Sequence, residues 1–464
     1  MEALLSANED VLIPPLSLGL KDGASYIQNR RSATIFSSVN QASPQGVQSI
    51  KFNISSSQEW CDPQSVIISF DVCNDDAAKA LYPSTPGAHC LFDKYSCRIA
   101  STEVENIDHY GRTCEMFSRL IPTEKKLNDG ALGFGTVMQQ YAAAGAVPDG
   151  GITAGSANVR RGIEKSLFTS GDHVAKAIPA SGKKKVFMKL PLSGIWTANQ
   201  KYLPLWSMGG GGIEVLLSLC PENSAVISRP TDPLTGVQGA AGSGSTTYHL
   251  ENIRIEADMI QIDSALQEQY SRNLLEGGSL TLHTKLWNVT QVFLGASNGG
   301  NFDVSVSKSL SRCATLFASF SEELTADQQA AGIQYVNQFK AYPAAAESME
   351  SHVTVGSKRF PEFQNKGVTA HFWRLISALG VAKSLPHSVS TDVESYGSNS
   401  FVLGTDFEAC PMVASSGINT TGGQQIDLHC AGFNDGANIL RRCWMCLHSE
   451  AIVELRATGA HLLT

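Results

Sequence analysis

Cysteine and histidine residues gather near the end of the 464-residue chain, where their spacing could hold a metal ion or support redox chemistry. Cys443 and Cys446 form a C-x-x-C pair, and His429, Cys430 and His448 lie close to it in the sequence. Thiolate and imidazole groups are zinc ligands, and a C-x-x-C pair can also be redox-active. However, the sequence contains no second C-x-x-C pair, and residues three apart in a strand point to opposite faces. We therefore interpret both cysteines as small buried hydrophobic side chains, with a metal or redox role as the alternative.

Two segments rich in glycine or lysine invite comparison with phosphate-binding loops. Gly209–Gly212 lacks the G-x-G-x-x-G spacing, and Gly182–Lys185 lacks the upstream glycine and the trailing Ser or Thr of a phosphate loop. We therefore predict turns at both segments. Contact between Lys183–Lys185 and an anionic partner is the alternative to a solvated start of a strand.

One carboxylate pair and five tryptophans complete the set of candidate side chains. Asp406 and Glu408 could share general acid–base work, but we interpret them as a charged strand end because the sequence indicates no cleft. The tryptophans lie within or beside periodic segments, which favours packing in a core or an interface: Trp196, Trp206, Trp287, Trp373 and Trp444. The sequence also lacks an H-E-x-x-H pair and the His-x-His pair that a cupin-like enzyme would need. We predict that the chain is not an enzyme and has no catalytic, cofactor or metal site.

The composition restricts the class of protein. Charged residues make up 17% of the chain, against roughly 25% in typical globular domains. The hydrophobic share of 42% excludes disorder, and no run of 18 apolar residues could span a membrane. The net charge is −8, and the first 40 residues carry no basic arm that could grip nucleic acid. A shortage of charge suits a surface that copies or partners cover.

The eleven cysteines are an odd number and are scattered along the chain. The start of the sequence has neither the basic region nor the apolar region of a secretory signal. We therefore expect reduced thiols rather than a disulfide framework, in a protein that is not secreted.

Alternation of apolar and polar residues predicts half-buried strands through the first half. These strands are expected at residues 50–54, 66–72, 186–196, 213–219 and 248–263. Between them, Val104, Ile107, Tyr110, Cys114 and Phe117 have helical spacing, which predicts a helix over residues 104–121 that ends before Pro122. Residues 123–182 are rich in glycine and alanine and indicate a long surface loop.

The second half repeats this order of elements. Strands are expected from Leu280 onward, with a short helix near residues 333–339 and a second helix over 367–380. Gly380 occupies the position of a C-terminal glycine cap, and a closing strand is expected at 449–459. Strands, a helix, a long connection and further strands therefore occur twice. This pattern predicts a mainly β protein made of two β-sandwiches, each decorated by a helix and long loops.

Several segments resemble the double jelly-roll major capsid proteins of eukaryotic DNA viruses, in the lineage of polinton-like viruses, virophages and nucleocytoplasmic large DNA viruses. The segments that carry this resemblance are 25–31, 45–47, 185–192, 201–206, 212–219, 401–409, 416–426 and 451–459. Residues 1–30 hold short apolar pieces without periodicity, which predicts an N-terminal arm. The resemblance implies that 31–265, including the loop 123–182, form a first eight-stranded jelly roll and that 266–464 form a second. It carries over no functional residue, because the family's role is structural.

The resemblance also implies a function and partners. Three copies would form a pseudo-hexameric capsomer in an icosahedral virion shell, next to neighbouring capsomers and to penton and minor capsid proteins. The subunit would assemble inside the host cell and make no sequence-specific contact with nucleic acid, and a membrane beneath the shell is left open. The alternative is a double β-sandwich that binds carbohydrate or acts as an attachment protein, which would need a surface cluster of aromatic and carboxylate groups.

Overall fold

The computed structural model describes most of the chain outside its first 25 residues and several connections. The described residues are 26–122, 131–135, 177–199, 201–221, 225–227, 242–295, 301–324, 335–345, 347–381, 389, 396–397, 400–407, 417–435 and 439–463. Most of the predicted arm, and most of the loop predicted at 123–182, lie outside these residues. Residues 27–30 of that arm belong to the first strand.

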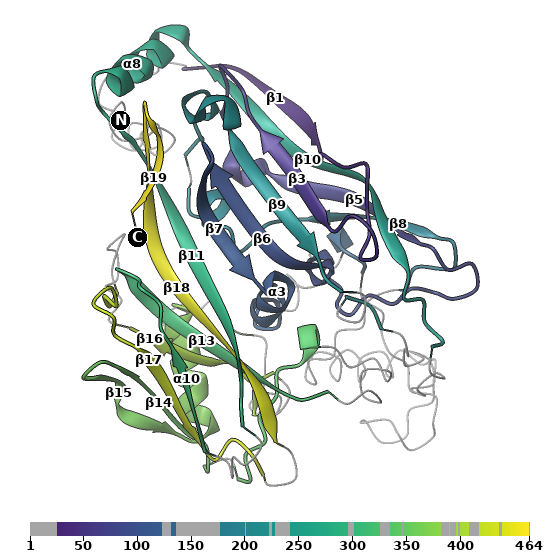
Figure 1. The fold of residues 1–464 in the computed structure, drawn as a ribbon, viewed down its shortest axis with the longest axis vertical. Helices are drawn as coiled ribbons and strands as arrows, with labels where there is room; N and C mark the ends of the chain where they lie inside the picture. The colour runs from purple at the N-terminus through teal and green to yellow at the C-terminus, as the bar shows by residue number, and fades with distance from the viewer. Residues whose placement is uncertain are drawn as a thin grey trace.

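Two antiparallel sheets form the first half of the molecule (Figure 1). One sheet has the order β1 (Ile27–Phe36), β10 (Tyr248–Ile262), β5 (Ile67–Asn74) and β8 (Lys183–Met188), and the two-residue strands β2 (Gln41–Ala42) and β4 (Trp60–Cys61) also pair with β10. The other has the order β3 (Ser49–Ile54), β9 (Ile213–Leu219), β6 (Phe92–Ile99) and β7 (Thr102–Asp108).

Two further sheets form the second half. One has the order β11 (Leu280–Phe293), β18 (Leu440–Arg456), β13 (Cys313–Glu322) and β16 (Leu403–Asp406), with β19 (Gly459–Leu463) paired to β18. The other has the order β12 (Phe302–Val306), β17 (Ile426–Ala431), β14 (Glu350–Val355) and β15 (Lys358–Lys366).

The two halves have the same connectivity. With the short β2, β4 and β19 set aside, the described part of each half contributes eight strands in chain order. In both halves one sheet places the first, eighth, third and sixth strands side by side, and the other places the second, seventh, fourth and fifth. This double Greek-key arrangement is a jelly roll. It occurs twice, so every strand of one roll has a counterpart in the other.

Alternating burial holds each roll together. In β9, Ile213, Val215 and Leu217 are fully buried while the residues between them are half-buried. In the second roll Leu428 of β17 is the counterpart of Val215, because Val215 pairs with Phe52 and Leu428 pairs with Val304 at matching positions. Both rolls thus fill the space between their sheets with one apolar row per strand.

The helix predicted over residues 104–121 is only half correct. Residues 102–108 form strand β7, and helix α3 begins at Tyr110 and ends at Ser118. The register of β7 against β6 shifts between Cys97 and Arg98. Such a bulge inserts one extra residue, so the buried Val104 and Ile107 are three apart, as they would be in a helix.

The other helices divide between confirmed and unforeseen. Helix α10 (Val368–Ala378) matches its prediction, and Gly380 has the left-handed φ of 73° that a glycine cap requires. Of the helix expected at 333–339, the described part is a single turn, η4 (Tyr335–Asn337). Helix α8 (Ser264–Leu275) was not foreseen. It links the two rolls (Figure 1) and spans the predicted boundary at 265/266, which stays a prediction.

Candidate functional site

The joint between the two jelly rolls is built around helix α3, which directly follows the fifth strand of the first roll. Its inner side packs on β6 and on the turn η2 (Ala88–Leu91). Gly111 allows this close approach, because a Cβ there would lie 2.6 Å from the carbonyl oxygen of His89. On the other side, the ring of Phe117 lies 5.1 Å from Trp287 and 5.1 Å from Phe317, both in the second roll.

Helix α3 also carries a buried guanidinium into the second roll. The Cζ atom of Arg112 lies 3.7 Å above the ring of Trp444 and 4.4 Å above that of Phe339. Arg112 donates hydrogen bonds to the hydroxyl of Ser319 and to the carbonyl of Tyr335. Burial lowers the pKa of this guanidinium well below its usual value. Cation–π contacts of this kind are worth more when desolvated, about 2 kcal/mol, so Arg112 specifies how the second roll docks.

A second buried group, Glu105 of β7, ties the rolls together from the sheet side. Its carboxylate accepts hydrogen bonds from the backbone N–H of Ile195 at 2.8 Å and from the hydroxyl of Thr284 on β11 at 2.6 Å. The hydroxyl of Ser193 donates a third bond at 2.5 Å. Burial raises the pKa of Glu105, and these donors oppose that rise.

Close backbone packing completes the joint beside Glu105. A Cβ on Gly194 would lie 1.9 Å from the backbone nitrogen of Lys285, so only glycine fits there. The amide of Asn199 donates to the carbonyl of His283 at 2.8 Å and accepts from its N–H at 3.1 Å. The close packing at Gly194 and the paired hydrogen bonds of Asn199 therefore fix the position of the first roll against strand β11 of the second.

The joint covers the outer face of one sheet of the second roll. Residues 313–321 of β13 are all buried, although a strand in a simple sandwich shows alternating burial. The residues turned away from the roll's own core include Phe317 and Ser319, which contact Phe117 and Arg112 of α3. Trp444, which pairs with Ser319, lies on the same face. This sheet is thus covered on both sides.

The counterpart sheet of the first roll has no such cover among the described residues. Its outward row on β5 includes Asp71 and Cys73, which are half-buried. Ion pairs lie on this face: Lys183 Nζ of β8 is 3.1 Å from Glu251 of β10, on the far side of β5, and Arg254 Nε is 3.0 Å from Glu256 within β10. Where the second roll presents aromatic rings to α3, the first roll presents charges to solvent.

The counterpart of α3 is α10, which follows the fifth strand of the second roll. Its inner side packs on β16, where Gly404 lets Leu375 approach. Its outer side exposes Trp373, with 55% of the residue accessible, and Phe363 of the preceding strand is 83% exposed. Trp373 and Phe363 are thus two of the large apolar side chains that the second roll exposes to solvent in a single copy.

The structure separates most of the cysteine and histidine candidates. Cys443 and Cys446 lie on opposite faces of β18, as their three-residue spacing predicts, and both are buried. Burial raises the pKa of both thiols. His429 belongs to another sheet, where its Nδ1 lies 2.6 Å from Asp303. His448 lies against Trp287, with ring centroids 4.5 Å apart.

The remaining candidates lie at turns and strand ends. Gly209–Gly212 closes the 3-10 turn η3 (Leu205–Gly211), and a Cβ on Gly212 would meet the carbonyl of Ile54 at 2.3 Å. Gly182 precedes β8, and Lys183 begins it. Asp406 is exposed at the end of β16, and Glu408 lies outside the described residues.

The tryptophans behave as packing residues with one exception. Trp196 and Trp444 are buried, Trp206 and Trp287 are half-buried, and Trp373 is exposed. No described helix is long and apolar enough to cross a membrane.

Comparisons with known proteins place this architecture. No protein-family model matches the chain, and a search of curated proteins gives no match in sequence. Among solved structures, the Faustovirus major capsid protein has a TM-score of 0.58 at 10% sequence identity, over 94% of this chain and 92% of that chain. VP54 of PBCV-1, whose crystal structure was fitted into a reconstruction of the virophage Sputnik, has a TM-score of 0.56 at 10% identity, over 96% and 99%. A chain of the Sputnik virophage structure has a TM-score of 0.52 at 11% identity, over 97% and 92%.

The chain has the double jelly-roll fold of viral major capsid proteins. The predicted fold class is therefore confirmed. In this double jelly roll, sequence reasoning missed buried charges at the joint, among them Glu105 and Arg112, because the spacing of Val104, Ile107 and Tyr110 was interpreted as one amphipathic helix, on which charged residues are expected to face solvent. It also missed a cluster on the first roll, Cys73, His249 and Glu251. The local signal for that cluster was a histidine and a glutamate two apart in a strand.

Proposed function

We propose that this double jelly-roll chain is a major capsid protein, three copies of which form a pseudo-hexameric capsomer of an icosahedral DNA-virus shell. The observation that carries the proposal is the unequal use of two equivalent helices. Helix α3 is buried in the joint between the rolls, whereas α10, which follows the equivalent strand of the second roll in chain order, leaves Trp373 exposed.

The geometry of the joint supports a ring. Within one chain, the helix of the first roll covers the outer face of a sheet in the second roll. If each roll covers the next in the same way, α10 of one copy covers the β1–β10–β5–β8 sheet of the next copy. Such a head-to-tail contact closes into a ring when the rotation fits, and three chains supply six rolls.

The chemistry of the open surfaces supports a contact between subunits that fold separately. The aromatic face inside the chain is permanently covered, while the equivalent open face carries ion pairs such as Arg254–Glu256. Interfaces between separately folded proteins are more polar than internal joints, with aromatic anchors such as Trp373 at their centre. The 17% content of charged residues fits a chain with much of its surface covered.

Further elements of the proposal follow from the likeness to capsid proteins. The protein would lie in the virion capsid and be assembled inside the host cell rather than secreted. Its partners would be neighbouring capsomers together with penton and minor capsid proteins. The net charge of −8 argues against direct contact with nucleic acid.

Light scattering coupled to size-exclusion chromatography tests both the ring and the helix. We expect a particle of three times the chain mass of 49.6 kDa. The variant Trp373→Asp should yield monomers that fold with an unchanged circular dichroism spectrum, because the side chain is exposed in a single copy. The matched control is Leu275→Asp on α8, which is 80% exposed and should leave the trimer intact.

Two results would contradict the proposal at different levels. A wild-type chain that stays monomeric at high concentration would remove the capsomer. A trimer that survives Trp373→Asp would leave the capsomer standing but reject α10 as its contact.

A further inference from the structure

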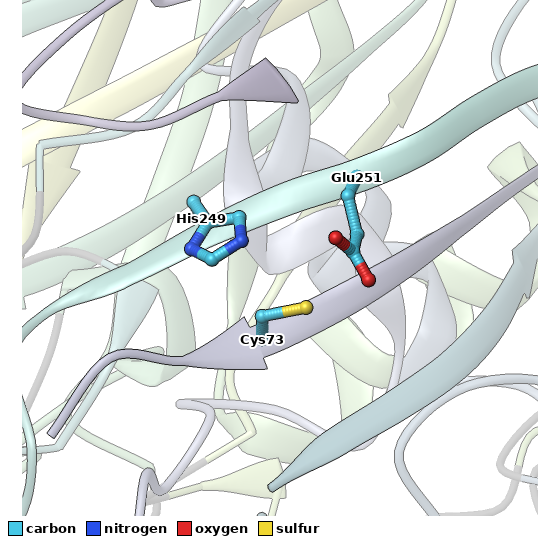
Figure 2. A group of neighbouring side chains, drawn as sticks. All are labelled: Cys73, His249 and Glu251. Atoms are coloured by element: carbon cyan, nitrogen blue, oxygen red, sulfur yellow. The ribbon is translucent and has the colours of Figure 1, made fainter. Parts of the chain in front are cut away.

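Three potential metal ligands converge on the outer face of the first roll. The thiol of Cys73, the imidazole of His249 and the carboxylate of Glu251 each offer one ligand atom, and these atoms lie within 4.8 Å of one another. Figure 2 shows one ring nitrogen of His249 and the Glu251 carboxylate turned toward the sulfur of Cys73. Among the described residues this is the one group of three or more such side chains.

The sheet fixes this convergence. His249 and Glu251 are two apart in β10 and therefore point to the same face. Cys73 of β5 is the direct cross-strand partner of His249, and such partners have Cβ atoms about 4.5–5.5 Å apart. Two ligands from one strand and a third from its neighbour need no loop to bring them together. The backbone holds all three whether or not a cation is bound.

Cys73 differs from the other thiols of the chain. Of the ten cysteines that the structure describes, nine are fully buried and Cys73 is half-buried. The buried ones act as small hydrophobic side chains. Cys73 instead lies on a polar face beside a carboxylate and an imidazole, where sulfur gains nothing from apolar packing.

The carboxylate of Asp75 contacts the imidazole of His249. Asp75 Oδ1 lies 2.5 Å from His249 Nδ1. If Nδ1 carries the proton and donates to Asp75, the lone pair remains on Nε2. A carboxylate that orients a histidine in this way is a recurrent outer partner of zinc ligands, where it fixes the tautomer and raises the basicity of the imidazole.

We propose that Cys73, His249 and Glu251 bind a Zn²⁺ ion that clamps β5 to β10, with water as the fourth ligand. One sulfur, one nitrogen and one carboxylate oxygen form a donor set that suits zinc, whereas Ca²⁺ and Mg²⁺ prefer oxygen ligands alone. Zinc bonds of about 2.0–2.3 Å in a tetrahedron put ligand atoms roughly 3.5 Å apart. Small side-chain rotations therefore suffice to close the site.

One cation and one proton must leave when zinc binds. The ammonium of Lys183 lies 3.1 Å from Glu251 Oε1, but its side chain is 61% exposed and can turn into solvent. Burial and the neighbouring Glu251 raise the pKa of Cys73 to about 12. Zinc binds the thiolate, so the thiol proton is released as the ion enters. All ligands come from one sheet of one chain, so the inference does not depend on the proposed capsomer.

Titration of Zn²⁺ into the chelator-treated full chain tests the site. We expect one ion per chain and a rise in melting temperature. Co²⁺ in place of Zn²⁺ should give a thiolate-to-cobalt charge-transfer band. Cys73→Ser and Glu251→Gln, both conservative surface changes, should abolish stoichiometric binding, and Cys73→Ser should remove the cobalt band. Asp75→Asn should weaken binding by about 10–100-fold.

The matched control is His461→Ala. His461 lies directly opposite Glu454 in the β18–β19 ladder, so it offers a histidine and a carboxylate on paired strands. This variant should bind Zn²⁺ like the wild type. Absence of stoichiometric binding, or binding that survives both Cys73→Ser and Glu251→Gln, would overturn the proposal. Neither result would bear on the oligomeric state, which reports the capsomer separately.

Discussion

The two jelly rolls share one connectivity but differ in what covers the same sheet. In the second roll the outer face of β11–β18–β13–β16 carries Trp444 and Phe317, which pack against α3. In the first roll the equivalent face carries the ion pair Arg254–Glu256 and the cluster around Cys73. The strand order therefore does not dictate the chemistry of this face. The segment that packs on this face dictates its chemistry. A face that is permanently covered can carry aromatic residues, whereas an open face retains charged ones.

The helices that follow the fifth strand of each roll, α3 and α10, differ in the same way. Helix α3 buries seven of its nine residues between the rolls, including Arg112 and Glu115. Helix α10 buries three residues on its inner side and leaves Trp373 in solvent. Because α3 packs against the second roll of its own chain, it can bury charges in specific contacts. Helix α10 instead keeps an exposed surface that a second copy could cover.

The largest expected effect concerns what the rolls have in common, their cores. Val215→Asp in the first roll and Leu428→Asp in the second each place an unpaired charge at a fully buried position. Such a charge costs about 3–5 kcal/mol or more, so we expect both variants to be lost from the soluble fraction. The measurement is soluble yield together with circular dichroism, and Glu214→Gln, on the outward face of the same strand, is the control. A folded Val215→Asp protein would show that β9 does not face the core.

These cores could be predicted from the sequence because the alternation of apolar and polar residues is clearest in strands with one buried face and one solvent-exposed face. Ile213, Val215 and Leu217 stand out for that reason. Alternation fails where both faces are covered. In β18, the start at Leu440 was missed because Trp444, Met445 and Cys446 are all buried, so no period of two remains.

Local sequence patterns could not predict which distant strands pair with each other. Cys73 and His249 become cross-strand partners only once β5 and β10 pair. The bulge in β7 imitated helical spacing at Val104 and Ile107, which hid the strand and with it Glu105. Sequence periodicity reports burial on one element, and it cannot report which distant element supplies the cover.

A smaller effect is expected when pH is lowered, because His448 lies on the covered outer face of the second roll and its protonation changes the free energy of unfolding. Burial and nearby Lys285 lower the pKa of His448 to about 4, and its Nε2 is buried without a hydrogen-bond partner among the described residues. The unfolded chain takes up a proton near pH 6.5 while the folded chain does not until about pH 4. The contribution of His448 to stability is therefore complete above pH 6.5 and is lost as pH falls towards 4, by up to about 3 kcal/mol.

Urea unfolding between pH 4 and 7 measures this contribution. His448→Phe should flatten the decline in free energy of unfolding relative to the wild type, and His461→Gln, on the exposed strand β19, should not. An unchanged slope in His448→Phe would mean that the second roll's outer face admits water, and the contrast between the two faces would weaken.

The smallest effect is expected on the open face, and it gives the sharpest test of the contrast. Arg254 lies 3.0 Å from Glu256 and 3.1 Å from the hydroxyl of Ser69, with about a third of each charged side chain exposed. Exposed ion pairs contribute about 0–1 kcal/mol and weaken in salt. Arg254→Gln, measured in the Trp373→Asp background so that assembly does not contribute, should therefore change the free energy of unfolding by less than about 1 kcal/mol. Trp444→Ala on the equivalent covered face should cost about 3–5 kcal/mol. Equal losses from the two variants would show that the first roll's face is already covered within the single chain, and the reason to seek its cover in a second copy would disappear.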